Sequence, residues 1–268
     1  MYLKSISRKV GLVFMVLIGT WNITNAQISP PGLGKAKTAF WAAFGVRKKL
    51  DSLGTKQHMT YIGLGRKSTP EANNPFSNQA ILVLNHEYYH RFTKHQQYSY
   101  ALSYRRQNAY ASSAPYDGEG VEQEFRAYGR YAYIIPAGRW KWTNTVRQEF
   151  RKFFTSDFGK AEENFQLRTR IKSQLVYTLS SKNKQSLALS AEGLLATSAM
   201  NEAEKQWTPY AYKETRLGIY YQFKIPRSDL SMDVGYVNNL IRGNHQAKAG
   251  IHYLAMDLVW DLPFHDKP

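Results

Sequence analysis

The segment that most constrains the fold is residues 164–178, in which apolar and polar side chains alternate. Its apolar side chains are Phe165, Leu167, Ile171, Leu175 and Tyr177, and its polar ones are Gln166, Arg168, Arg170, Lys172, Gln174 and Thr178. Because successive side chains of a β-strand point to opposite faces, this strand has one apolar face and one cationic face. A β-barrel in a lipid bilayer suits both faces, with lipid outside and water and ion pairs inside.

The first 26 residues have the features of a secretory signal peptide. Basic residues at the start are followed by an apolar stretch over residues 10–20, and Ala26 closes a small-residue cleavage site. The stretch is shorter than the roughly 20 residues that a membrane-spanning helix needs, which disfavours a permanent anchor. We therefore predict that residues 1–26 are removed and that Gln27 begins the mature chain. The chain has no cysteine, which excludes a lipoprotein anchor and disulfides.

The chain is strongly basic, with 36 Lys and Arg against 20 Asp and Glu. Without Lys4, Arg8 and Lys9 of the predicted signal peptide, 33 basic and 20 acidic residues remain, which is a net charge of +13. Such a balance usually indicates nucleic acid or an anionic surface as a partner. Because an exported protein seldom meets nucleic acid, we expect no nucleic-acid binding and interpret the charges as the lining of a barrel.

Alternation recurs through most of the mature chain and divides it into hairpins. Short connections rich in Gly, Pro, Asn and Ser join the members of each pair, as in β-hairpin turns. Longer polar connections separate the pairs, which is typical of outer-membrane barrels with periplasmic turns and external loops. The expected strands are 38–50 and 56–66, 80–92 and 97–107, 120–135 and 139–154, 164–180 and 185–196, 211–225 and 229–241, and a last strand over 246–262; the long connections are 67–79, 108–119, 155–163 and 197–210.

The number of these segments is odd, whereas single-chain bacterial barrels have an even number of strands. Either residues 27–37 supply a further strand, or one of the segments does not cross the membrane. Pro30 and Pro31 make residues 27–37 a poor strand. We predict an all-β, antiparallel up-and-down transmembrane β-barrel over residues 38–264, with 12 strands and with 10 as the alternative. An N-terminal extension over residues 27–37 precedes it.

The end of the chain and the aromatic residues favour the same location. The last predicted strand carries Leu254, Met256 and Leu258 on one face and is followed by Phe264, which resembles the terminal signal of proteins inserted by the barrel-assembly machinery. Aromatic residues form 14% of the chain and cluster near predicted strand ends, as interfacial girdles do; general β-propensity is the alternative explanation. The expected location is the cell outer membrane, with its lipids, the assembly machinery and other envelope proteins as partners.

Charged residues on the other predicted strands fall on the face that would line the lumen. An Arg on the lipid face costs about 2–4 kcal/mol at the bilayer midplane, so a barrel must place these residues inward. Two interpretations remain open: paired charges that fill a narrow lumen and only stabilise it, or a surface that contacts anions. The predicted lumen-lining residues are Glu122, Glu124, Arg126, Arg130, Lys141, Arg147, Glu149, Arg151, Arg168, Arg170, Lys172, Glu192, Glu214 and Arg216.

The sequence contains no recognisable catalytic constellation. Outer-membrane lipases and lipid A deacylases carry a Ser two residues after a His, and none of the 7 histidines has a Ser at that spacing. His86 and His90 would be about 13 Å apart on an extended strand, which is too far for one metal ion, and Glu87 points to the other face. We therefore expect no enzymatic activity, no metal and no cofactor.

Several short motifs carry a resemblance to a known family. They are Phe125-Arg126, Arg147-Gln148-Glu149-Phe150-Arg151, Phe165-Gln166-Leu167-Arg168-Thr169-Arg170, Glu214-Thr215-Arg216-Leu217-Gly218 and Val234-Gly235-Tyr236, after an aromatic start at Phe40-Trp41. With these motifs the chain resembles an uncharacterised family of Bacteroidota outer-membrane proteins, a domain of unknown function. The resemblance covers most of the mature chain and implies a barrel and a phylum, but no reaction.

Three hypotheses for the function follow. The first is a structural or accessory outer-membrane barrel, such as a subunit of an envelope complex. The second is a narrow, porin-like channel for small anionic solutes, for which the excess of Arg over Glu is the support. The third is an envelope lipid-modifying enzyme, which the lack of a catalytic motif disfavours.

Overall fold

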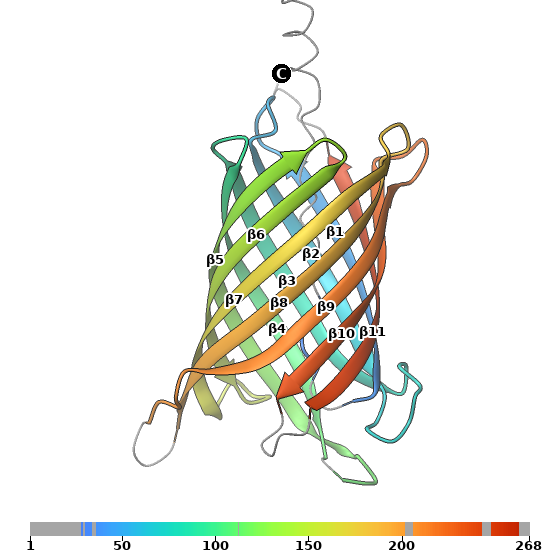
Figure 1. Ribbon diagram of the computed structural model, residues 1–268. Coiled ribbons are helices and arrows are strands. Elements are labelled where there is room, and N and C mark those ends of the chain that lie inside the picture. Colours follow the sequence, from blue (N-terminus) through green and yellow to red (C-terminus); the bar gives the residue numbers. More distant parts are fainter. Residues whose placement is uncertain are drawn as a thin grey trace, which may run out of the picture.

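The computed structural model describes residues 28, 30–33, 36–111, 113–201, 206–242 and 248–262. Within them the chain forms eleven β-strands that close into one barrel (Figure 1). The strands are β1 (Thr38–Lys49), β2 (Lys56–Lys67), β3 (Asn78–Arg91), β4 (Gln96–Tyr110), β5 (Gly118–Ala137), β6 (Trp140–Phe154), β7 (Lys160–Ser180), β8 (Gln185–Met200), β9 (Ala211–Lys224), β10 (Leu230–Arg242) and β11 (Lys248–Leu262). No helix in the described part of the chain is long and apolar enough to cross a membrane. The predicted signal peptide, residues 1–26, lies outside these residues.

The predicted all-β class and the barrel are confirmed, and each alternating segment of the sequence corresponds to one strand. The boundaries differ mainly at the ends that join long connections. There, β7 begins at Lys160 rather than residue 164, and β8 continues to Met200 rather than residue 196. The strands therefore extend into polar sequence that had been assigned to loops. Short turns and longer connections alternate along the chain, and we call the two ends of the barrel the turn end and the loop end.

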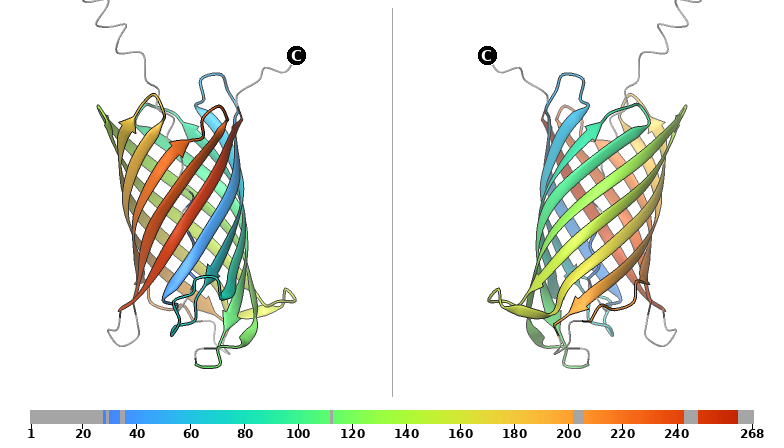
Figure 2. Two further views of the ribbon diagram at one scale, coloured as in Figure 1. Left: turned by 90° about the vertical axis from the view of Figure 1, so that its right-hand side faces the viewer. Right: turned by 90° about the vertical axis from the view of Figure 1, so that its left-hand side faces the viewer.

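The predictions of 12 strands and of 10 strands are both wrong, and so is a wholly antiparallel barrel. β1 and β11 are direct neighbours and pair in parallel, from Thr38 opposite His252 to Lys48 opposite Leu262. The other neighbouring strands, such as β1 and β2 or β10 and β11, pair antiparallel. The parallel pair follows from parity, because the first and last strands of an odd up-and-down series run in the same direction. Figure 2 shows β1 and β11 side by side.

The described residues of the N-terminal extension do not supply a twelfth strand. Within 27–37, the described residues 28, 30–33, 36 and 37 belong to no strand, and we call residues 28, 30–33 and 36 the inner segment. A Cβ built on Gly45 of β1 would lie 3.6 Å from Ile28, and one built on Gly65 of β2 would lie 3.2 Å from Leu33. The inner segment therefore lies inside the barrel, against β1 and β2. Its two prolines lack the N–H that a strand needs for its ladder, which explains why it stays out of the wall.

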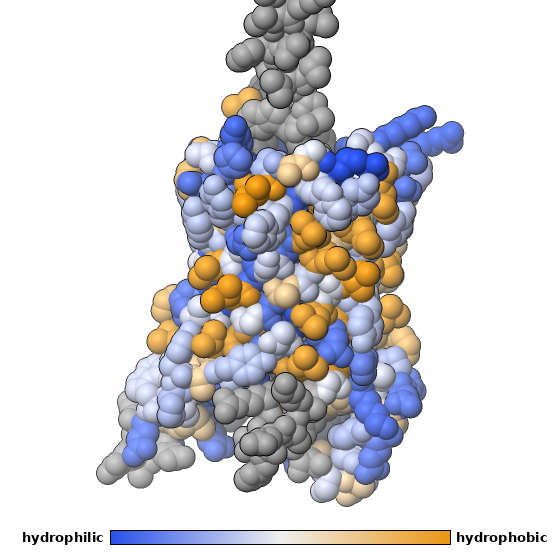
Figure 3. Space-filling view, in the orientation of Figure 1, coloured by the Kyte–Doolittle hydropathy of each residue, from blue (hydrophilic) through white to orange (hydrophobic). Residues whose placement is uncertain are grey.

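The two faces of the wall differ as the alternation predicts. On β7, Gln166 and Arg170 are buried inside the barrel, whereas Ile171 points outward and is 55% exposed. On β4, the outward Leu102 is 70% exposed. Figure 3 shows apolar side chains gathered over the middle of the visible face and polar ones toward its ends. The outer surface is thus more apolar than the lumen, the reverse of a barrel that folds in water.

One side of the lumen is apolar, which the sequence interpretation missed. Trp41 of β1 is 1% exposed and donates a hydrogen bond from Nε1 to Asp257 at 3.0 Å. Its ring fills the space over Gly63, where a Cβ would overlap it. Leu33 of the inner segment and Ile81 of β3 belong to the same buried cluster. This apolar side of the lumen, formed mainly by β1–β3 and β10–β11, holds the inner segment in place.

Candidate functional site in the barrel lumen

Strands β3 to β9 carry acidic and basic side chains into the lumen, where they form connected ion pairs. The ladder of paired neighbours β3-β4-β5-β6-β7-β8-β9 brings residues that are far apart in the sequence onto one inner wall. We call the group the ion-pair network; it comprises Glu87, Arg105, Glu124, Arg126, Arg130, Arg147, Glu149, Arg151, Arg170, Glu192, Glu214 and Arg216.

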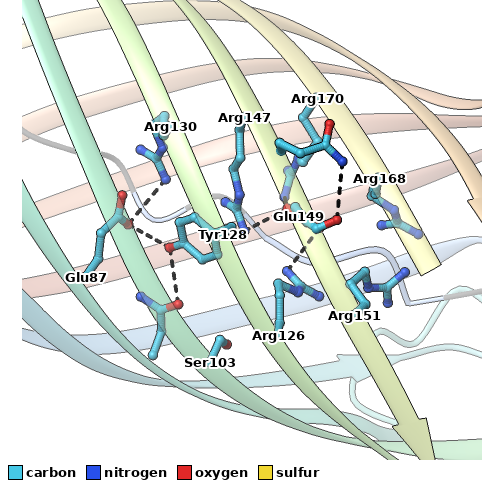
Figure 4. Close-up of polar contacts among 12 residues, drawn as sticks. Glu87, Ser103, Arg126, Tyr128, Arg130, Arg147, Glu149, Arg151, Arg168 and Arg170 are labelled. Carbon is cyan, nitrogen blue, oxygen red and sulfur yellow. Dashed lines mark hydrogen bonds and ion pairs between the residues drawn. The ribbon is translucent and has the colours of Figure 1, made fainter. Parts of the chain in front are cut away.

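Glu149 of β6 lies at the centre of the ion-pair network and is fully buried (Figure 4). Its carboxylate is 2.7 Å from Arg147, 3.2 Å from Arg170 and 3.7 Å from Arg126. These arginines come from β5, β6 and β7, so one carboxylate links three adjacent strands. Buried charges need such partners because moving an unpaired ion out of water costs roughly several kcal/mol.

Glu124 of β5 is the second shared carboxylate. Arg151 of β6 donates to both of its oxygens, at 2.8 and 2.6 Å, in the bidentate geometry that gives the strongest pairs. Arg126 approaches at 2.7 Å and Arg105 of β4 at 3.5 Å. Arginines therefore outnumber carboxylates here, and the pairs are shared rather than separate.

The remaining carboxylates lie at the two sides of the network. Glu87 of β3 accepts hydrogen bonds from Ser99 at 2.6 Å and from Tyr128 at 2.7 Å, and Arg130 lies 3.3 Å away. Figure 4 shows Glu87 with Tyr128 and Arg130.

On the opposite side, Arg170 donates to both oxygens of Glu192 of β8, at 3.0 and 2.6 Å. Arg216 of β9 then joins Glu192, at 3.8 Å, to Glu214. Asn239 of β10 donates to Glu214 at 2.8 Å. The network thus spans most of the circumference of the lumen.

The inner segment is bound to the lumen wall through its backbone. Arg216 donates to the carbonyl oxygen of Pro30 at 2.9 Å, and Arg105 donates to that of Gly32 at 2.7 Å. Lys67 donates to the Leu33 carbonyl at 3.1 Å, while the Leu33 N–H donates to the hydroxyl of Tyr253 at 3.1 Å. Two members of the ion-pair network therefore also hold the segment, so the lumen is occupied by protein over this length.

A cavity of about 90 Å³ remains between the network and the turn end. We call it the turn-end cavity. Its apolar lining includes Ile28 of the inner segment, Met59 of β2 and Ile134 of β5. Its polar lining includes Lys141, Thr143, Thr145, Arg147 and Lys172, with further charges from Glu87, Arg130, Arg170 and Glu192. Five cations and two carboxylates line the cavity.

The structure brings ten of the fourteen predicted lumen residues into the ion-pair network. The other four lie apart from these pairs: Arg168 donates to Gln166 at 3.0 Å, Lys141 and Lys172 line the turn-end cavity, and Glu122 is half-buried on β5. The ten network residues are Glu124, Arg126, Arg130, Arg147, Glu149, Arg151, Arg170, Glu192, Glu214 and Arg216.

Two members of the network, Glu87 and Arg105, were missed. The signal for Glu87 was present in the sequence, because it alternates with His86 and Tyr88, which face outward. Arg105 follows the same logic on β4, whose pattern is buried at every second residue. The role of the inner segment had no such signal, because alternation describes strands only.

Comparison with known proteins gives a family but no activity. A family model described as "Protein of unknown function (DUF2490)" matches residues 19–249. No curated protein matches the chain.

Proposed function

We propose that this chain, which belongs to the DUF2490 family of proteins of unknown function, is an outer-membrane β-barrel with a closed lumen and a structural or accessory role in the cell envelope. The observation that carries the proposal is the combination of an apolar outer surface with a lumen occupied by the inner segment and the ion-pair network. The predicted signal peptide and the resemblance to Bacteroidota outer-membrane proteins support the same location.

The outer surface supports membrane insertion. Leu102, Ile171 and Leu254 are more than half exposed, and apolar neighbours surround them on successive strands. A contiguous apolar surface of this kind is unusual on soluble monomers, where patches seldom exceed roughly 300–600 Å². Exposed aromatic residues lie toward both ends of the wall, with Trp140 and Trp142 at the turn end and Phe125 and Phe158 near the loop end. Such belts match the interfacial girdles of membrane barrels.

The occupied lumen supports a role other than free diffusion of solutes. A pore conducts only if a continuous aqueous path joins its two mouths, and here the backbone of Pro30, Gly32 and Leu33 is bonded to the wall. A barrel of this kind offers its outer surface and its loops to partners, as a subunit of an envelope complex would.

A narrow channel for small anions is the second candidate. The observation in its favour is the excess of cations at the turn-end cavity, where Lys141 and Lys172 add to the arginines. Transport would then require movement of the inner segment, because that segment is held by four hydrogen bonds to the wall.

Single-channel recording in planar bilayers separates the two candidates. The purified protein is expected to insert without steady conductance. Recurrent openings that favour anions over cations would contradict the accessory role and support the anion channel. Fractionation of lysed cells tests the location independently, with the protein expected in the outer-membrane fraction; recovery from the aqueous fraction would contradict membrane insertion.

A further inference from the structure

The polar lining of the turn-end cavity carries hydrogen-bond donors that no described residue uses. Thr143 and Thr145 of β6 point into the cavity on the same face as Lys141. No hydrogen bond or ion pair joins the hydroxyls of the two threonines or the ammonium of Lys141 to another described residue. Their neighbours Gln174 and Lys172 on β7 lie directly opposite the two threonines in the sheet register. Gln174 and Lys172 already have partners, so the donors that no described residue uses are the two threonine hydroxyls and the Lys141 ammonium, all on β6.

The charges around these donors make the cavity electropositive. Arg147 and Arg170 are paired with Glu149 in the adjoining ion-pair network, and Arg130 is paired with Glu87. The charged groups that act on Lys141 are the cations Arg91 and Arg47 and one carboxylate, Asp233. A half-buried ammonium among cations is costly unless a counter-ion accompanies it.

We propose that the turn-end cavity binds a small oxyanion, of phosphate, sulfate or carboxylate type, through Lys141, Thr143 and Thr145. Hydroxyl and ammonium groups are donors, and an oxyanion is the ligand that accepts from all of them at once. A volume of about 90 Å³ admits several water molecules or one small anion and excludes a bulky solute. Lys141, Thr143 and Thr145 are only half-buried, so part of each remains accessible to a small ligand.

The apolar lining of the cavity refines the ligand class. Ile28 of the inner segment and Met59 of β2 line the cavity away from β6, whereas Ile134 of β5 lies directly beside Thr143 in the sheet. A carboxylate with a short apolar group would contact both linings, whereas inorganic phosphate would use the polar lining alone. This site does not depend on membrane location, so the proposal survives or fails separately from the proposed function.

Thermal unfolding of the purified protein in detergent micelles tests the site. Phosphate, sulfate and butyrate are titrated at constant ionic strength set with chloride, because a ligand at free concentration L that binds only the folded state stabilises it by RT ln(1 + L/Kd) and so raises the midpoint. The midpoint is expected to rise with at least one of the three anions. The Thr143→Val, Thr145→Val double variant lacks two hydroxyl donors and is expected to bind that anion about tenfold or more weakly. Valine keeps the shape of threonine, so the fold is preserved.

A second variant and a control complete the experiment. Lys141→Gln is expected to lower the affinity for the same anion by a similar factor. The control is Thr178→Val, on the inner face of β7 but outside the cavity lining, which is expected to leave that affinity unchanged. No midpoint shift beyond that of chloride with any of the three anions would overturn the proposal. A shift that all variants retain would also overturn it, because the anion would then bind elsewhere.

Discussion

At the scale of single residues, Glu149 is surrounded by three arginines from three strands, and its side chain is not exposed at all. Neutralising it leaves Arg126, Arg147 and Arg170 with less compensation in a buried place. Each buried charge in such a network depends on its partners, because a buried charge without a partner destabilises the fold. Its members are therefore more sensitive to single changes than the exposed charges at the barrel rims.

Glu149→Gln is expected to lower the free energy of unfolding by about 3–5 kcal/mol, because it removes one partner of a buried ion pair. Glu162→Gln, at an exposed position on β7, is the matched control and is expected to change it by about 0.5 kcal/mol or less. Urea unfolding of the protein in lipid vesicles measures both. Equal effects of the two variants would show that the network contributes no more than a surface charge.

Gly63 tests the packing of the apolar side of the lumen. A Cβ at Gly63 would overlap the ring of Trp41, so Gly63→Ala is expected to destabilise the barrel by about 1–3 kcal/mol through overpacking. Gly129→Ala is the control, since a Cβ there has no atom within 4 Å and alanine favours a strand over glycine by about 0.5–1 kcal/mol. The same unfolding measurement applies. A neutral Gly63→Ala would contradict the position of the Trp41 ring.

At the scale of elements, the turn between β1 and β2 depends on one aspartate. Burial alone would raise the pKa of Asp51, but hydrogen bonds from the Thr55 hydroxyl and from the Lys56 N–H outweigh it and lower the pKa below 3.8. A carboxyl with a lowered folded-state pKa stabilises the fold above its unfolded pKa, and this contribution is lost as the pH falls through the folded value.

Asp51→Asn is therefore expected to lower the thermal midpoint at pH 7 and to have a smaller effect near pH 3. The measurement is a pair of thermal melts of each protein at the two pH values. A difference between the two proteins that stays constant with pH would mean that the charge of Asp51 does not stabilise the turn.

The sequence predicted the strands far better than the way they close. Alternation over segments such as 164–178 depends on which face is buried, so it locates strands and sorts Arg168 and Arg170 from Ile171. Closure depends on which strands are neighbours, and no pattern within β1 or β11 records its partner. The even-number rule then favoured 12 strands, whereas the two prolines of the inner segment had already argued against the strand that this number required.

The candidate site was predictable for the same reason and to the same extent. Glu149 and Arg170 lie on strands, so their inward direction follows from the alternation of side chains along each strand. Their exact partners do not, because they depend on the register of β5, β6 and β7. Lys141 was predicted to face inward, but the cavity beside it is also lined by Ile28 of the inner segment and Met59 of β2, which alternation within β6 does not bring together with it.

For the whole molecule, the inner segment replaces a strand in the construction of the barrel. The described residues of the inner segment lie in the lumen, from Ile28 beside the turn-end cavity to Leu33 beside β2, before β1 begins at Thr38. This route gives an odd number of strands, a parallel closure and an occupied lumen together. Evidence against any one of these three features would therefore count against the other two.

Disulfide cross-linking tests this account most directly, because the chain has no cysteine of its own. Ala42 of β1 and Met256 of β11 are register partners on the outer face. Their Cα atoms are thus about 5 Å apart, within the range of about 4.4–6.8 Å that a disulfide spans. An Ala42→Cys, Met256→Cys double variant is expected to cross-link on mild oxidation, whereas Leu84→Cys with Met256→Cys, across two further strand spacings, is expected not to. If a twelfth strand lay between β1 and β11, the first pair would be about 10 Å apart and would stay reduced, which would contradict the account.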